Sequence, residues 1–301
     1  MSEIVTINTI AEAHTFMGQP APKHPLVSII ALKDMPVIDF GDVRFASKLY
    51  MISLKDGVVG SIGYGRNSYD FTNGTMIFGK PNQVYQSESK EISADSKGWT
   101  LLFHPDLIRK SELVKTIDSY NFFSYEVHEA LHLSEDEKET VTDTANKIRT
   151  EYQQPIDAHS QRLIVSNIQL LLDYCQRYYD RQFYVRTNMN QDLITRFEQF
   201  LKDYYSSEKP QELGIPSVRY CGEQMNMSPN YLSDLLRKET GRSAGDHIHE
   251  YIIDKAKNRL LASTDSIGQI AYDLGFEYPQ HFSKVFKKQT GMSPLKYRSL
   301  N

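Results

Sequence analysis

Cysteine is nearly absent from this sequence. Only Cys175 and Cys221 occur, and they form no CxxC motif or paired metal-ligand spacing, so a reduced, cytosolic setting is expected. No run of about eighteen apolar residues is present, so no membrane-spanning helix is expected. The opening Met1-Ser2-Glu3 lacks the basic-then-apolar pattern of a secretory signal. GxxxxGK and GxSxG motifs are also missing. The sequence therefore predicts a cytoplasmic protein with no membrane association.

An excess of basic residues is also lacking. The formal net charge is −4, which by itself argues against a nucleic-acid-binding protein. The charge is unevenly distributed, however: residues 190–301 carry fifteen basic and fourteen acidic residues, and Gln280 to Asn301 contains five basic residues and no acidic one. Because phosphate contacts are short-range at physiological salt, local charge matters more than the total. A solvated surface is the alternative interpretation of this basic tail.

The pattern changes along the chain from strands to helices. Short β-branched and apolar stretches such as residues 26–30 and 49–54 are separated by turn signals such as Asn73-Gly74, which is typical of an all-β barrel or sandwich. From about Pro105 the periodicity becomes helical. One apolar stripe recurs at three- and four-residue steps, through Leu163, Ile164, Ile168, Leu171, Leu172 and Cys175. The stripe must be buried against a sheet face or a second copy of the chain. The predicted fold class is α+β, with a junction around residues 186–190.

An internal repeat carries most of the functional argument. Residues 232–241, LSDLLRKETG, match residues 282–291, FSKVFKKQTG, in their apolar positions, a basic pair and the closing Thr-Gly. A repeat of this kind indicates two copies of one supersecondary unit. Each copy predicts a helix that ends at a glycine suited to a left-handed C-cap, Gly241 or Gly291. Proline stands in the first turn of each helix, where its missing N–H costs nothing.

A second short amphipathic helix is predicted before each of these helices. The first covers about residues 217–225 with a turn through Asn226-Met227, and the second covers about residues 266–274 with a turn at Gly275-Phe276. A helix, a tight turn and a second helix form the helix-turn-helix pattern. Residues 244–262 read as one connecting helix of about 30 Å at 1.5 Å per residue. Two recognition helices about 34 Å apart would enter successive major-groove segments of one duplex.

These motifs resemble the DNA-binding domain of the AraC/XylS family of bacterial transcription regulators. The resemblance rests on four stretches of the sequence: Ile270–Phe276, Phe282–Lys288, Thr290–Pro294 and Tyr297-Arg298. It implies a sequence-specific DNA-binding regulator, expected to be an activator and not an enzyme. Promoter DNA and RNA polymerase are the implied macromolecular partners. The alternative is a helical partner-binding protein without DNA affinity, because helix-turn-helix pairs also serve as plain packing units.

The resemblance also assigns site residues. In the first unit, base contacts fall to Asn230, Ser233 and Asp234. In the second unit they fall to the start of the helix, at Pro279, Gln280, His281 and Lys284. Phosphate contacts are expected from three basic residues: Arg237, Lys287 and Lys288. Asp234 is an unusual acidic contact that either accepts from a cytosine amine or lies off the DNA. Pro279 offers no donor, so only its ring could touch a base. The first unit is expected to contribute less sequence discrimination than the second.

The front half resembles the cupin-like domain that such regulators often carry. Residues 74–83 look like a cupin turn, and residues 99–108 look like the exit from its sheet. The resemblance implies two domains: residues 1–185 as a cupin-like β-barrel sensor with C-terminal dimerisation helices, and residues 186–301 as the double helix-turn-helix domain. Residues 1–110 contain no HxH pair, so neither a metal nor another cofactor is expected. A small-molecule effector and a homodimer are possible under this resemblance, but the sequence does not name effector-binding residues.

One motif competes with this interpretation. His128-Glu129-Ala130-Leu131-His132 matches the HExxH pattern of zinc peptidases, in which two histidines on one helix face bind the metal and the glutamate acts as base. Five residues with two free positions match often by chance. His132 also reads as a helix end, followed by a new helix capped by Ser134 with Glu137 completing a capping box. The motif is therefore expected to hold surface or interface histidines, with a zinc metallopeptidase as the alternative.

Overall fold

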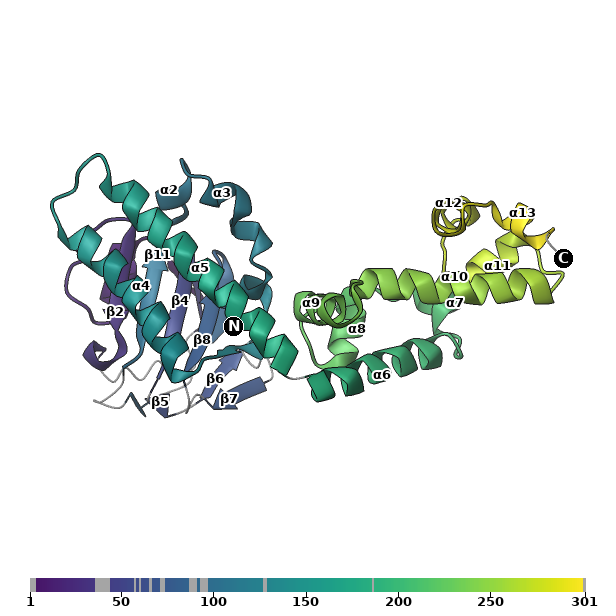
Figure 1. The fold of residues 1–301 in the computed structure, drawn as a ribbon, viewed down its shortest axis with the longest axis horizontal. Helices are drawn as coiled ribbons and strands as arrows, with labels where there is room; N and C mark the ends of the chain where they lie inside the picture. The colour runs from purple at the N-terminus through teal and green to yellow at the C-terminus, as the bar shows by residue number, and fades with distance from the viewer. Residues whose placement is uncertain are drawn as a thin grey trace. The chain divides into compact units, whose positions relative to one another are not determined.

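The computed structural model of the chain describes residues 4–35, 44–56, 58–59, 61–64, 67–70, 74–86, 91–92, 97–126, 129–185 and 187–299. The chain divides into two compact units, Met1–Tyr184 and Val185–Asn301 (Figure 1). The first unit mixes strands and helices, and the second is helical. The α+β class predicted from the sequence is therefore confirmed.

The first unit is organised around an antiparallel five-stranded sheet in the order β12-β8-β4-β11-β2. Its strands are β2 (Val27–Ala31), β4 (Tyr50–Lys55), β8 (Thr75–Gly79), β11 (Trp99–Phe103) and β12 (Leu131–His132). Strands β2 and β4 begin and end one residue after the two stretches that the apolar pattern predicts, residues 26–30 and 49–54. All five residues of β8 and of β11 are buried, as expected for strands that are covered on both faces.

Smaller sheets complete the strand-rich part of the unit. Three strands pair in the order β1-β3-β9: β1 (Ile4–Ile7), β3 (Arg44–Ser47) and β9 (Gln83–Gln86). Two further pairs are β5 (Val58–Val59) with β10 (Glu91–Ile92) and β6 (Ser61–Tyr64) with β7 (Asn67–Asp70). Across the residues that the structure describes, these four sheets do not join into one closed barrel. The cupin-like barrel remains a prediction.

Two long helices lie across one face of the five-stranded sheet, α4 (Glu135–Gln153) and α5 (Ser160–Val185) (Figure 1). The Tyr152 hydroxyl of α4 accepts a hydrogen bond from the Ile29 N–H at 3.1 Å, and the Cys175 Sγ of α5 lies 3.8 Å from the Met76 Sδ. The predicted apolar stripe of α5 is thus buried against a sheet face within the chain. Leu163 is an exception, because it is 42% exposed. Leu163 and Leu170 are seven residues apart and share the outer side of the helix.

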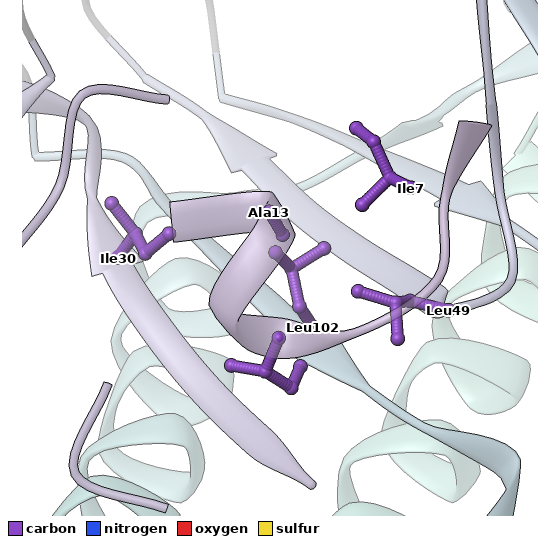
Figure 2. Close-up of a cluster of buried hydrophobic side chains, with 6 residues drawn as sticks. Ile7, Ala13, Ile30, Leu49 and Leu102 are labelled. Atoms are coloured by element: carbon purple, nitrogen blue, oxygen red, sulfur yellow. The ribbon is translucent and has the colours of Figure 1, made fainter. Parts of the chain in front are cut away.

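The opposite face of the sheet is partly covered by the N-terminal helix α1 (Ile10–Phe16). Ile10 and Ala13 pack with Leu49 against Ile30 and Leu102 of the sheet, in the cluster that Figure 2 shows. Short helices α2 (Pro105–Ile108) and α3 (Leu113–Thr116) and the 3₁₀ turns η1 (Leu32–Asp34), η2 (Ile117–Ser119) and η3 (Asn121–Ser124) complete the unit. The α1 cluster therefore gives the sheet a second apolar layer.

The second unit consists of eight helices over the residues that the structure describes. They are α6 (Thr187–Tyr204), α7 (Lys209–Leu213), α8 (Val218–Met225), α9 (Pro229–Thr240), α10 (Ala244–Ala262), α11 (Ile267–Asp273), α12 (Pro279–Thr290) and α13 (Pro294–Arg298). Helices α8 to α12 match the helices that the repeat predicts, and α10 has the predicted bounds. Its buried residues are Ala244, Ile248, Ile252, Ile253, Ala256 and Leu260.

Candidate nucleic-acid interface

The first helix-turn-helix is formed by α8 and α9. Asn226 adopts the left-handed conformation at φ 55°, and the Met227 N–H donates to the Gly222 carbonyl at 2.9 Å. This bond closes α8 as a Schellman motif and turns the chain sharply. A Cβ on Gly222 would lie 2.6 Å from the Met227 carbonyl oxygen, so only glycine fits the corner. Ser228 then caps α9 by accepting from the Tyr231 N–H at 3.2 Å.

The second helix-turn-helix is formed by α11 and α12, and it repeats this arrangement. Gly275 has φ 87°, and the Phe276 N–H donates to the Ala271 carbonyl at 3.0 Å. Tyr278 precedes α12 without a side-chain cap, and Pro279 fills the first turn. Both α9 and α12 end at a left-handed glycine, with φ 78° at Gly241 and 77° at Gly291. The sequence repeat is therefore a structural repeat, and its turns use the residues that the sequence indicates.

Helix α10 contacts both helix-turn-helix units and holds them in place. Thr240 at the end of α9 is hydrogen-bonded to His247 of α10 at 2.7 Å. At the other end, Arg298 of α13 donates to the carbonyls of Asp265 at 2.6 Å and Leu260 at 3.4 Å. Figure 1 shows α9 and α12 towards opposite ends of α10. Its nineteen residues correspond to about 28 Å of helix.

The inner faces of α9 and α12 make the core of their units. Leu232, Leu235 and Leu236 are buried in the first, and Phe282 and Phe286 are buried in the second. Val285 was predicted to share this face, and it is only half-buried. With the apolar sides fixed against α10 and its neighbours, the polar sides of α9 and α12 are left to face outward.

The predicted contact residues differ in exposure between the two helices. On α9, Asn230, Ser233 and Asp234 are half-buried and Arg237 is exposed. On α12, Pro279 is half-buried, and the other predicted residues are exposed: Gln280, His281, Lys284, Lys287 and Lys288. The structure thus gathers both predicted sets on the outer sides of their helices. Their contacts with DNA remain predictions.

An ion pair changes the chemistry of α9. The Arg237 Nη1 lies 2.9 Å from the Asp234 Oδ1, with Arg237 56% and Asp234 16% exposed. The carboxylate neutralises part of the cation that is predicted to anchor phosphate. On α12, the exposed Lys284, Lys287 and Lys288 make no ion pair with any residue that the structure describes. The second helix therefore presents the stronger positive potential.

Two exposed tyrosines beside α12 were not singled out from the sequence. Tyr272 of α11 is 52% exposed and Tyr278, just before α12, is 60% exposed. A hydrogen bond to Glu277 raises the pKa of Tyr278 above its ordinary value. For Tyr272, the signal in the sequence was an aromatic residue at a polar position of an amphipathic helix. The Tyr272 hydroxyl is able to donate to phosphate or to a base edge.

The described part of the HExxH segment, residues 129–132, does not form the helix that a zinc peptidase requires. His128 lies outside the described residues, while Leu131 and His132 form strand β12, paired with Met76 and Thr75 of β8. The predicted helix end at His132 is therefore wrong, because strand pairing at the sheet edge fixes this segment. The capping box of Ser134 and Glu137 is confirmed at the start of α4. Among the described residues, no three His, Cys, Asp or Glu side chains gather as a metal site.

The helix-turn-helix family and curated relatives match the region just described. A family described as a helix-turn-helix domain matches residues 221–299. Residues 221–299 form an AraC-type helix-turn-helix domain. The resemblance seen in the sequence is thereby confirmed. No helix among the described residues is long and apolar enough to span a membrane.

Several relatives of this AraC-type domain are named as transcription regulators. The chain is 35% identical over 92 residues to the uncharacterized transcriptional regulatory protein YesN of Bacillus subtilis, covering 29% of the chain and 25% of that protein. It is 32% identical over 141 residues to the regulator YfiF of Bacillus subtilis, covering 47% and 41%. It is 30% identical over 109 residues to the transcriptional activator RhaR of Escherichia coli, covering 36% and 35%. The chain thus spans less than half the length of these relatives, none of which is named as an enzyme.

Proposed function

We propose that the chain is a transcription regulator that binds promoter DNA in a sequence-specific way through α9 and α12. The carrying observation is the pair of matched helix-turn-helix units at opposite ends of α10, with polar outer faces on both recognition helices. A spacing of about 34 Å would bring two such helices into successive major-groove segments on one side of a duplex. One chain would then read two adjacent segments without a partner.

The two helices have different roles in this proposal. Helix α12 supplies most of the sequence discrimination, because Gln280, His281 and Lys284 are exposed and able to reach base edges. Lys287 and Lys288 follow on the next turn and anchor the helix on phosphates. Helix α9 contributes Asn230 and Ser233, while the ion pair with Asp234 holds Arg237 back from a phosphate. The second groove segment would therefore be the better conserved half of a binding site.

The N-terminal compact unit, Met1–Tyr184, is proposed to act as a cupin-like sensor that controls the DNA-binding domain through a small molecule. Activation of transcription, contact with RNA polymerase and homodimer formation belong to the same proposal, on the resemblance to the family. The exposed outer side of α5, with Leu163 and Leu170, is the surface that a second copy would use.

Selection of bound sequences from random duplex DNA by the full chain tests the proposal. We expect one enriched site with two informative segments about one helical turn apart. Its affinity should fall steeply as salt rises, because phosphate contacts release counterions. A chain without salt-sensitive DNA affinity would instead support the helical partner-binding alternative. Enrichment of a single short segment would contradict the two-helix arrangement.

A further inference from the structure

The two faces of the five-stranded sheet can be told apart by strand register. Met76 faces α5, because its sulfur lies 3.8 Å from that of Cys175. Leu54 and Leu131 are the register partners of Met76, so they point to the same, helix-covered side. Side chains alternate along each strand, and therefore Lys55, Thr75 and His132 point to the opposite side.

These three residues form one row across three neighbouring strands. Thr75 of β8 pairs with Lys55 of β4 on one side and with His132 of β12 on the other. Adjacent strands are about 4.8 Å apart, so the backbones that carry the amine, the hydroxyl and the imidazole span about 10 Å. All three groups are able to donate a hydrogen bond. A second polar pair lies on the same face, where the Ser53 and Thr100 hydroxyls are 2.7 Å apart.

The amine of Lys55 meets no opposite charge among the described residues of this face. The described residues of the face include no aspartate or glutamate, and Lys55 makes no ion pair with any described residue. Burial lowers the pKa of Lys55 to about 8, while its side chain as a whole is only half-buried. The group is thus surrounded by protein and still reached by solvent. A buried cation without a partner is costly, and a bound anion would offset that cost.

Lys138 on the other face shows the contrast. Its ammonium lies 3.3 Å from the Asp56 carboxylate and 2.6 Å from that of Glu135. Those carboxylates, together with their hydrogen bonds, keep the pKa of Lys138 above its ordinary value although burial alone would lower it. The two half-buried lysines, Lys55 on β4 and Lys138 on α4, therefore differ in one respect: among the residues that the structure describes, Lys138 has carboxylate partners and Lys55 has none.

The α1 cluster covers one part of this face. The row of Lys55, Thr75 and His132 lies outside that cluster. Ile30 and Leu102 belong to that cluster, with Met51 packed against it, and they lie on β2, β11 and β4 away from Lys55. The polar row is at the other end, on β4, β8 and β12. The face is therefore divided into an apolar end filled by α1 and a cationic end that no described residue neutralises.

We propose that Lys55, Thr75 and His132 bind the carboxylate of a small organic acid. One ammonium matches the single charge of a carboxylate, whereas a phosphate dianion would leave a buried charge uncompensated. The Thr75 and His132 side chains supply the further hydrogen bonds that a buried carboxylate needs. The site rests on the proposed small-molecule control of the DNA-binding domain and names the class of ligand, but it can be tested without DNA.

The test follows the Lys55 amine directly. The lysines of the full chain are reductively methylated with ¹³C-formaldehyde, and the Lys55 signal is assigned by its loss in Lys55→Met. The Lys55 signal is then titrated with pH, first without any added compound and then with acetate, hexanoate or benzoate. The titration is repeated with the three corresponding amides and with inorganic phosphate. We expect at least one carboxylate to raise the pKa of Lys55 by one unit or more, while its amide leaves it unchanged. The exposed Lys97 signal, assigned with Lys97→Met, should not move.

Calorimetric titration of the unmethylated chain gives an independent measure. The carboxylate that shifts Lys55 should bind at least tenfold more weakly to Lys55→Met and equally well to Lys97→Met. Lys55→Met should melt no lower than the parent, because it removes an unpaired buried charge. A Lys55 signal that responds to none of the carboxylates, or to inorganic phosphate alone, overturns the proposal. DNA affinity of Lys55→Met, measured separately, reports on the proposed function and not on this site.

Discussion

The backbones of Gly214 and Gly275 are in direct contact, although sixty residues lie between them in the sequence. A Cβ on Gly275 would lie 2.6 Å from the carbonyl carbon of Gly214. Gly275 is the turn of the second helix-turn-helix, and Gly214 follows α7, ahead of the first. The Tyr204 hydroxyl at the end of α6 also donates to the Gly214 carbonyl at 2.8 Å. The segment from α6 to α7 therefore holds the second helix-turn-helix in place, together with α10.

Gly275→Ala should destabilise the domain strongly. Both the left-handed backbone and the close approach of Gly214 exclude a Cβ, so a loss of about 3 kcal/mol in the free energy of unfolding is expected. Gly291→Ala is the matched control, because its φ of 77° is similar and no atom lies within 4 Å of the added carbon. The control should lose about 1 kcal/mol. Urea unfolding of both variants measures the difference, and equal losses would show that the contact does not matter.

Asp273 links the second helix-turn-helix to α10. Its carboxylate should make the free energy of unfolding depend on pH. Burial by itself would raise the pKa of Asp273, but hydrogen bonds from Gln269 and Arg259 lower it below 3.8, with the Arg259 Nη2 at 2.7 Å. A depressed pKa in the folded state adds stability above the unfolded pKa, and this stability is lost as the pH falls through the folded value. Asp273→Asn should therefore lower stability by about 1 kcal/mol at neutral pH and weaken the loss below about pH 4.

Asp254→Asn is the control for this experiment, since its ion pair with Lys257 at 2.9 Å is on the exposed side of α10. It should change stability by less than about 0.5 kcal/mol. Thermal unfolding between about pH 2 and pH 7 compares the three proteins. A parent chain and an Asp273→Asn variant with parallel pH profiles would contradict the assigned role of Asp273.

Lys284 and Lys288 should affect DNA binding in different ways. Lys284→Ala should cost about 1–3 kcal/mol at one base pair and relax specificity there, because its side chain is predicted to reach a base edge. Lys288→Ala should weaken binding to all sequences alike and reduce the salt slope by about 1, because it is predicted to bind a phosphate. Fluorescence anisotropy on the selected site and its single-base variants measures both effects. If Lys284→Ala leaves specific and nonspecific affinity unchanged, its assignment is wrong.

Asp234→Asn tests whether the Asp234 carboxylate keeps Arg237 of α9 from binding a DNA phosphate. If the ion pair with Arg237 keeps the guanidinium from phosphate, the variant should bind all sequences more tightly, and its salt slope should rise by about 1. If Asp234 instead accepts from a cytosine amine, the variant should lose discrimination at one base pair by about 1–3 kcal/mol. Asp254→Asn removes the same charge from a similar i,i+3 pair on α10 and should do neither.

The HExxH segment should bind no zinc. With Leu131 and His132 in a strand, a shared helix face for the two histidines is not available. Elemental analysis of the purified chain should find far less than one zinc per chain, and EDTA should leave DNA affinity unchanged. Stoichiometric zinc that is lost in His132→Ala would revive the peptidase alternative.

Several elements could be predicted from local sequence because their physical causes are local. Ser228 and Pro229 specify the start of α9, and Gly241 its end, through capping bonds and allowed backbone angles. The capping box at Ser134 followed from the same reasoning. Where a partner decides the outcome, local sequence was insufficient. Residues 128–132 fit a helical pattern, but pairing with β8 makes part of that segment a strand.

By itself, the sequence determined that two similar helix-turn-helix units exist, where they turn, and which sides of α9 and α12 are polar. These features depend on periodicity, caps and glycine angles, which act within a few residues. Only the tertiary structure decided that α5 packs on the chain's own sheet, that Gly214 contacts Gly275, and that Lys55 shares a row with His132. Such contacts join residues far apart in the chain, and their selection depends on how buried surfaces fit together.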